Sequence, residues 1–241
     1  MKPCYLLVTF CLGCVSGGGG LDYRISHTEY NNQDCQQEKE ACFVANINYP
    51  EFEGLDSLKL IFPKRIVGNG IIDALGMGDA ESTELPDIEK ALNYVAGSLE
   101  KVKDSFTYGS GWIVDVQTIP VYKNDTILVF ALEIMTYFGG AHPNTNRVYY
   151  NLNRQTGKRL HYNWFSDQGF EEKAETIFRR INHLNPDDII NDLRVGYSFP
   201  NNKFQLPANY GFKGDSVVLY YNRYEIAPYA KGPTEFVISI N

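Results

Sequence analysis

The residues best placed for chemistry lie in one short segment, Tyr-Phe-Gly-Gly-Ala-His-Pro-Asn at positions 137–144. The paired glycines permit backbone angles that other residues avoid. Pro143 restricts the residue before it to an extended conformation. We therefore expect a sharp corner that fixes the position of His142. The candidate ligand-binding residues of this corner are Gly139, Gly140, His142 and Asn144.

His142 invites a metal-binding or catalytic interpretation, because His161 could approach it across a neighbouring hairpin. Zinc sites use three or four protein ligands, however, and the sequence around these two histidines supplies no evident third or fourth. The simpler interpretation is a corner histidine whose ring hydrogen-bonds to the backbone. We predict neither a metal ion nor a cofactor.

A second candidate site is the loop Tyr-Glu-Ile-Ala-Pro-Tyr at positions 224–229. Tyr224, Glu225 and Tyr229 could contact a ligand, with Glu225 facing a cation or a sugar hydroxyl. The same residues also suit a structural loop that is fixed by Pro228, and the sequence leaves both interpretations open.

Catalytic patterns are weak along the chain. No serine or cysteine stands in a recognisable nucleophile elbow, and the acidic residues are too numerous to nominate a glycosidase pair. The sequence therefore supports an enzyme less well than a binding protein. A carbohydrate-processing hydrolase that uses Glu225 or His142 is kept as the alternative.

The charge balance narrows the class of partner. The chain carries 29 acidic and 22 basic residues, a net charge of -7. Nucleic-acid binding needs a clustered basic surface that neutralises phosphates, and the sequence shows none. We therefore predict no nucleic-acid partner and favour a basic one.

The first residues are typical of an export signal. Lys2 precedes a short apolar run at 5–12, too short to span a membrane. Cys14 follows Gly13 and resembles the lipobox cysteine of bacterial lipoproteins, although Cys11 stands where such sequences usually have leucine. We predict a signal peptide at 1–13, a lipidated Cys14 with a glycine-rich tether at 14–24, and attachment to the bacterial cell envelope. Ordinary cleavage near Ser16 is the alternative.

Two further cysteines, Cys35 and Cys42, remain in the exported part. An even number of cysteines in an oxidising compartment predicts a disulfide. The six polar residues between them suit a surface loop, and so short a ring would add about 2 kcal/mol. Two unpaired thiols are the alternative.

Hydrophobic periodicity predicts the elements that position these residues. Helical spacing appears at 87–106 and again from 166 or 167 to 184, with a short helix restarting at 185–188. The segment 55–75 predicts only a short helix followed by irregular chain, because Pro63, Gly68 and Gly70 interrupt it.

Alternating patterns predict strands at 25–30, 42–49, 112–122, 126–138, 148–152, 158–162, 209–212, 216–221 and 234–240. Pro50 should end the second of these. The strand at 126–138 is apolar on both faces, so it should be central. The order of elements predicts an α+β fold with antiparallel sheets packed by two principal helices.

Two segments together carry a family resemblance: Gly-Gly-Ala-His-Pro-Asn at 139–144 and Tyr-Tyr-Asn-Arg-Tyr-Glu-Ile-Ala-Pro-Tyr-Ala-Lys-Gly at 220–232. The pair resembles the extracytoplasmic domain of the anti-sigma factor RsiV and the non-catalytic N-terminal part of the deacetylase PdaC. The resemblance implies an N-terminal sub-domain at 25–155 and a C-terminal RsiV-like sub-domain at 156–241.

The resemblance also implies a function. RsiV binds lysozyme through this module, so we expect an envelope-anchored, non-enzymatic lipoprotein that recognises a protein such as lysozyme or a cell-wall glycan. No membrane helix, sigma-binding region or deacetylase domain is recognisable, so those roles are not carried over. A structural adaptor of an envelope complex, marked by a large exposed apolar patch, is a further alternative.

Overall fold

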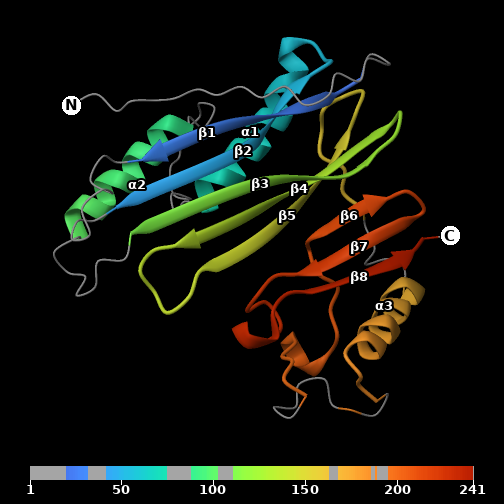
Figure 1. Cartoon of the computed structure of the whole chain (residues 1–241). Helices are drawn as coiled ribbons and strands as arrows, with labels where there is room; N and C mark the ends of the chain where they lie inside the picture. The colour runs from blue at the N-terminus through green and yellow to red at the C-terminus, as the bar shows by residue number, and fades with distance from the viewer. Residues whose placement is uncertain are drawn as a thin grey trace.

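Two β-sheets and three α-helices form the fold in a computed structural model that describes residues 20–31, 42–74, 88–102, 111–162, 168–185, 188 and 195–240 (Figure 1). The first sheet has the order β1-β2-β3-β4-β5, with β1 (Asp22–Asn31), β2 (Phe43–Glu53), β3 (Trp112–Lys123), β4 (Ile127–Tyr137) and β5 (Asn144–Asn153). The second has the order β6-β7-β8, with β6 (Tyr210–Lys213), β7 (Ser216–Tyr221) and β8 (Thr234–Ser239). The helices are α1 (Ser57–Ala74), α2 (Ile88–Val102) and α3 (Gln168–Ile181).

The predicted α+β class is confirmed, and the first sheet differs from the prediction in one pair of strands. β2 and β3 run parallel, whereas the other neighbouring strands are antiparallel. A parallel pair needs a long crossover connection. Here α1 and α2 lie between β2 and β3 in the chain, so the first sheet is mixed.

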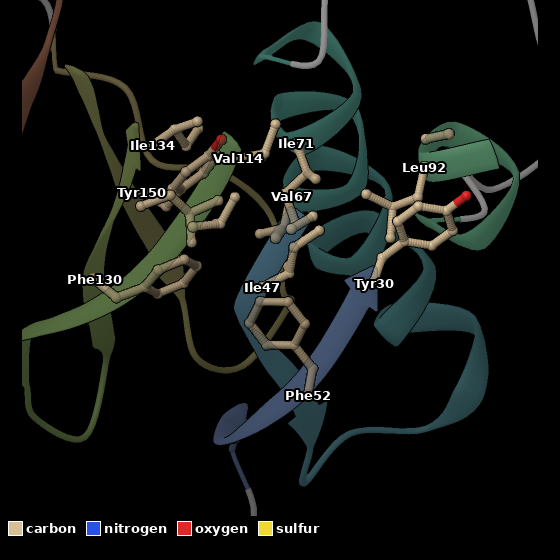
Figure 2. Close-up of a cluster of buried hydrophobic side chains, with 14 of the residues drawn as sticks. Tyr30, Ile47, Phe52, Val67, Ile71, Leu92, Val114, Phe130, Ile134 and Tyr150 are labelled. Atoms are coloured by element: carbon tan, nitrogen blue, oxygen red, sulfur yellow. The ribbon is translucent and has the colours of Figure 1, made fainter. Parts of the chain in front are cut away.

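The first hydrophobic core lies between the five-stranded sheet and the helices α1 and α2. Figure 2 shows Val67 and Ile71 of α1 facing Ile47 of β2, with Phe130 and Tyr150 from the far strands beside them. Leu92 of α2 closes the same core near Tyr30. Both helices are therefore needed to cover this face of the sheet.

The prediction of irregular chain after a short first helix is wrong, because α1 continues to Ala74. Pro63 and Gly68 are buried against the neighbouring structure. A methyl group at Gly70 would overlap the Tyr150 hydroxyl, so glycine permits close approach of helix and sheet there. Tertiary packing thus overrides the weak local helix propensity.

The second core lies between the two sheets and α3. β4 contributes to both cores, with Leu128, Phe130 and Leu132 in the first and Val129 and Ala131 in the second. The predicted interior position of this strand is confirmed, because β4 lies between β3 and β5 and both of its faces are buried. Phe178 of α3 contacts five aromatic rings, including that of Tyr221.

Two strand predictions are corrected by the pairing. β2 continues through Pro50 to Glu53, since beyond Ile47 it is registered only with β1 and a proline is tolerated where no second neighbour needs its N–H. The segment 158–162 forms a single bridge, Leu152 to Arg159, instead of a strand. The predicted helix at 185–188 lies largely outside the described residues. Within the described ranges, no helix is both long and apolar enough to cross a membrane.

Candidate functional site

Side chains from the two predicted loops meet at one end of the molecule. His142 lies in the β4–β5 turn, and Tyr224 and Tyr229 lie in the loop between β7 and β8. The His142 and Tyr229 rings stack with centroids 3.7 Å apart and an interplanar angle of 18°. The Tyr224 hydroxyl lies 3.1 Å from His142 Nε2. We call His142, Tyr224 and Tyr229 the aromatic cluster.

Hydrogen bonds to one backbone carbonyl hold the cluster in place. The Tyr229 hydroxyl donates to Pro143 O at 3.0 Å, and His142 Nδ1 lies 3.1 Å from the same oxygen. In the neutral ring, Nδ1 therefore carries the proton and Nε2 accepts from Tyr224. Arg223 donates to Tyr229 O at 2.9 Å, with its guanidinium carbon 4.5 Å from the Tyr229 ring centroid.

The cluster is open to solvent although it is well ordered by these contacts. Tyr224 is 58% exposed and has φ of 66°, in the left-handed region. Such a conformation is unfavourable for a bulky residue and is concentrated at ligand clamps and switch regions. A fixed, exposed group of aromatic rings can bind a partner, with ring faces for apolar contact and polar tips for hydrogen bonds.

The other predicted ligand-binding residues lie next to the cluster in the same two loops but are not part of its ring contacts. Gly139 has φ of 83° and makes the turn, whereas a methyl group at Gly140 would make an ordinary van der Waals contact with His142 O at 3.9 Å. Asn144 is exposed at the start of β5, opposite Thr136. Glu225 accepts a hydrogen bond from Asn222 N at 2.8 Å, so its carboxylate caps the turn. Desolvation raises the pKa of Glu225, and the hydrogen bond from the Asn222 backbone opposes this shift.

The two residues of the catalytic alternative, Glu225 and His142, are each held by hydrogen bonds. The carboxylate of Glu225 points back to its own turn, while His142 is engaged by Pro143 and Tyr224. In the part of the chain that the structure describes, no group of three histidine, cysteine or acidic side chains is placed to hold a metal ion. Cys14 and Cys35 lie outside the described residues, so lipidation and the pairing of Cys35 with Cys42 stay predictions.

Beneath the cluster lies an ion-pair network that the sequence did not reveal. Arg147 of β5 donates to Glu133 of β4 at 2.7 and 3.0 Å and to Glu235 of β8 at 2.8 Å. Burial lowers the pKa of Arg147, but hydrogen bonds to Glu133 and Tyr149 outweigh it, so the net pKa is raised. One cation thereby links both sheets.

Asparagine side chains continue this link along β5. Arg147 N donates to Asn222 Oδ1 at 2.7 Å and Tyr149 N donates to Asn209 Oδ1 at 2.9 Å. Both asparagines in turn donate to Arg147 O, at 3.0 and 2.6 Å. Asn151, only 2% exposed, bonds to Tyr210 O and Phe212 N, each at 2.8 Å. We call Asn151, Asn209 and Asn222 the amide ladder.

A cavity of about 530 Å³ lies on the first sheet, among residues of β1, β2, β3 and β4. Its lining includes Arg24, His27, Asn48, Tyr122 and Lys123. The register of β3 shifts between Pro120 and Tyr122, beside this cavity. Such bulges are frequent next to binding sites because they redirect side chains.

His27 belongs to a chain of polar side chains at this cavity. Its Nδ1 lies 2.8 Å from Asn48 Oδ1 and its Nε2 lies 2.9 Å from Glu29 Oε1. Asn48 donates to Gln117, and Gln117 donates to Asp115. Both ring nitrogens of His27 therefore face acceptors, which favours the protonated ring. The hydrogen bond to Glu29 raises the pKa of His27, partial burial lowers it, and the bond to Asn48 raises it.

Comparisons with known families find two different matches, one on each side of residues 146–157, which include most of β5. Residues 36–145 match the family described as Deacetylase PdaC, and residues 158–241 match the family described as Protein of unknown function (DUF3298). The chain is thus similar to PdaC over its first part and to DUF3298 over its last part. The resemblance to the RsiV-like domain family is thereby confirmed. The aromatic cluster draws His142 from the first region and its two tyrosines from the second.

Two crystal structures share this fold. A DUF3298 family member from Bacteroides fragilis has a TM-score of 0.63 and 16% identity, and the match covers 92% of each chain. A DUF3298 family protein from Pseudomonas aeruginosa has a TM-score of 0.60 and 22% identity over 91% of this chain and 90% of that one. Identities this low establish the fold alone. Among curated proteins, the sequence finds no match.

Proposed function

We propose that this PdaC/DUF3298 chain is an envelope-anchored, non-enzymatic lipoprotein whose aromatic cluster binds a basic protein, with a lysozyme-type hydrolase as the first candidate. The observation that carries the proposal is the meeting of His142 with Tyr224 and Tyr229 on an exposed surface. The resemblance to RsiV, whose module binds lysozyme, supplies the candidate ligand.

The composition of the cluster supports protein recognition. Tyrosine is enriched among the interface residues that contribute most to binding, because it combines a large apolar ring with a polar tip. Tyr224 is 58% exposed in the free chain, so a partner can bury it. The contacts of His142 and Tyr229 with Pro143 O keep both rings in place before binding, which lowers the entropic cost of association.

The charge of the chain supports a basic partner. A net charge of -7 accelerates the encounter with a cationic protein through long-range attraction. Such attraction is screened by salt, whereas contacts made by buried rings are not. Salt dependence therefore separates general attraction from recognition by the cluster.

The test is calorimetric titration of hen egg-white lysozyme into the mature chain. The chain carries Cys14→Ser so that no lipid is attached. We expect saturable one-to-one binding that persists at high salt. The double substitution Tyr224→Ala and Tyr229→Ala should weaken binding by about tenfold or more, the range of residues that dominate an interface. An oligosaccharide of N-acetylglucosamine in place of lysozyme tests the cell-wall glycan.

Tyr94→Ala is the matched control, because Tyr94 on α2 is also 58% exposed and lies outside the cluster. Its affinity for lysozyme should equal that of the unsubstituted chain. Binding heat that disappears with salt, or equal losses in the control and cluster variants, would contradict recognition by the cluster. Saturation by the oligosaccharide alone would replace the protein ligand with a glycan.

A further inference from the structure

Helix α1 exposes an apolar stripe on the face that points away from the sheet. Leu58 is 74% exposed, Ile61 is 42% exposed and Phe62 is 50% exposed. Their spacing of three and four residues places them on one side of the helix. The opposite side carries Val67 and Ile71, which are buried in the first core (Figure 2). Within the part of the chain that the structure describes, the fold therefore buries one face of α1 and leaves the side chains of its other apolar face exposed.

Basic residues surround this stripe although the chain as a whole is acidic. Lys59, Lys64 and Arg65 are exposed on the same helix. Lys59 pairs with Asp56 at 3.2 Å, just before the helix begins, and the acidic residue within α1 is Asp73, next to its end. Lys158 lies with its Nζ 5.8 Å from the Phe62 ring centroid. A helix that combines exposed apolar side chains with flanking lysine and arginine suits the surface of an anionic bilayer.

The tether ends beside the first turn of this helix. The Gly20 carbonyl lies directly against Gly54, and Gly54 stands three residues before the start of α1. Cys14, the predicted lipidation site, precedes Gly20 by six residues. Six residues span at most about 20 Å when fully extended. A lipid on Cys14 would therefore be attached within about 20 Å of Gly20, which lies against the residues that lead into α1.

We propose that the exposed face of α1, formed by Leu58, Ile61, Phe62, Lys59, Lys64 and Arg65, lies on the anionic surface of the membrane that holds the Cys14 lipid. The proposal rests on the lipid anchor of the proposed function. The lipid would hold the chain at the membrane, and the apolar and basic side chains of α1 would add a second contact that sets its orientation there. The bilayer, instead of a protein, is the occupant of this face.

The orientation that follows is compatible with ligand binding. Gly157, just beyond β5, lies against Lys59 O and Pro63 of α1, while the other end of β5 begins at Asn144 beside the aromatic cluster. The ten residues of β5 span about 30 Å. Figure 1 shows the β4–β5 turn at the end of the sheet remote from the β5 end that meets α1. Docking through α1 would keep the cluster clear of the lipid.

The test measures vesicle binding of the mature chain with Cys14→Ser, so that the result does not depend on lipidation. Vesicles of 30% phosphatidylglycerol in phosphatidylcholine are compared with pure phosphatidylcholine by co-sedimentation at low and moderate salt. We expect binding to be at least threefold stronger to the anionic vesicles. Leu58→Ser with Phe62→Ser, and separately Lys64→Glu with Arg65→Glu, should each weaken it about fivefold or more.

Tyr94→Ser is the matched control, since it removes an equally exposed ring from α2, and it should bind as the unsubstituted chain does. A second readout uses Phe62→Trp and Tyr94→Trp with brominated lipids, where added quenching is expected for the first variant alone. Equal binding by the control and both α1 variants, or equal quenching, would overturn the proposal. These vesicle results do not depend on whether the chain binds lysozyme. The lipid anchor is tested separately, by asking whether Cys14→Ser releases the native protein from membranes.

Discussion

The two outer strands of the five-stranded sheet, β1 and β5, differ in what covers their free edges. β5 is covered by the second sheet, where the amide ladder and Arg147 bond its backbone and its neighbours. β1 faces solvent, where Arg24 pairs with Glu51 at 2.9 Å and His27 pairs with Glu29. The side chains of the Arg24 pair are 47% and 43% exposed, whereas those of Arg147 and Glu133 are 24% and 33% exposed.

This difference predicts that the same kinds of charged and amide side chains contribute more to stability at β5 than at β1. At β5, a lost side chain leaves buried N–H or C=O groups, or the partly exposed carboxylates of Glu133 and Glu235, without partners, and each such group is costly. At β1, water replaces a lost partner at little cost. Charged and amide groups at β1 are therefore available for a ligand or a proton, while those at β5 hold the two sheets together.

The largest difference in stability between the two edges is expected when the arginine at each edge, Arg147 at β5 and Arg24 at β1, is replaced by methionine. Arg147→Met leaves Glu133 and Glu235 without their shared cation, so we expect the free energy of unfolding to fall by about 2–4 kcal/mol. Arg24→Met removes an exposed pair and should cost less than about 1 kcal/mol. Urea unfolding of the two variants gives both values. Equal losses would show that the edges do not differ.

The turn that leads into β5 offers a second matched pair. Gly139→Ala places a methyl group at φ of 83°, and we expect a loss of about 1 kcal/mol or more. Gly140→Ala places a methyl group at ordinary contact distance, 3.9 Å from His142 O, and should change stability by less than about 0.5 kcal/mol. Thermal unfolding measures both. A larger loss for Gly140→Ala would mean that the corner is built differently from the structure.

The smallest effect is expected at β1, from the protonation of His27. Its pKa is raised in the folded chain, so its contribution is fully present below the unfolded value of 6.5 and is lost as the pH rises through the folded value. Glu29, Asn48 and Asp115 are the groups that face it. His27→Gln should remove a contribution of about 1 kcal/mol or less, the size of an exposed ion pair.

The measurement for His27 is urea unfolding of the chain and of His27→Gln across pH 5.5 to 8.5. The excess stability of the unsubstituted chain should shrink as the pH rises. A difference that stays constant with pH, or grows, would show that the folded ring is not preferentially protonated.

Strong periodic patterns predicted most of the framework. α2 and α3 have one clear apolar face, and β4 has apolar residues on both, so burial alone determines their structure. The weakly patterned α1 was missed beyond its first turns, because the close packing of Gly70 on Tyr150 depends on residues far apart in the chain. The parallel pairing of β2 with β3 also depends on the crossover helices, which local sequence patterns do not specify.

The residues of the candidate site also fall into two groups, those that the sequence predicted and those that only the structure reveals. His142, Tyr224 and Tyr229 stand in distinctive motifs, and the structure brings them together. Arg147, Asn209 and Asn222 are single polar residues in ordinary strand and loop contexts, so only the packing of the two sheets reveals their role. The polar chain from His27 to Asp115 likewise crosses three strands and has no signature along the sequence.

The amide ladder has a consequence for the behaviour of the protein at high concentration. An uncovered outer strand presents a row of unpaired N–H and C=O groups, which recruits strands from other molecules and promotes aggregation. Asn209 and Asn222 occupy the Arg147 and Tyr149 positions of that row without adding a strand of their own. Two side chains thus protect the chain from polymerising through β5, and partial detachment of the second sheet would be the step that exposes it.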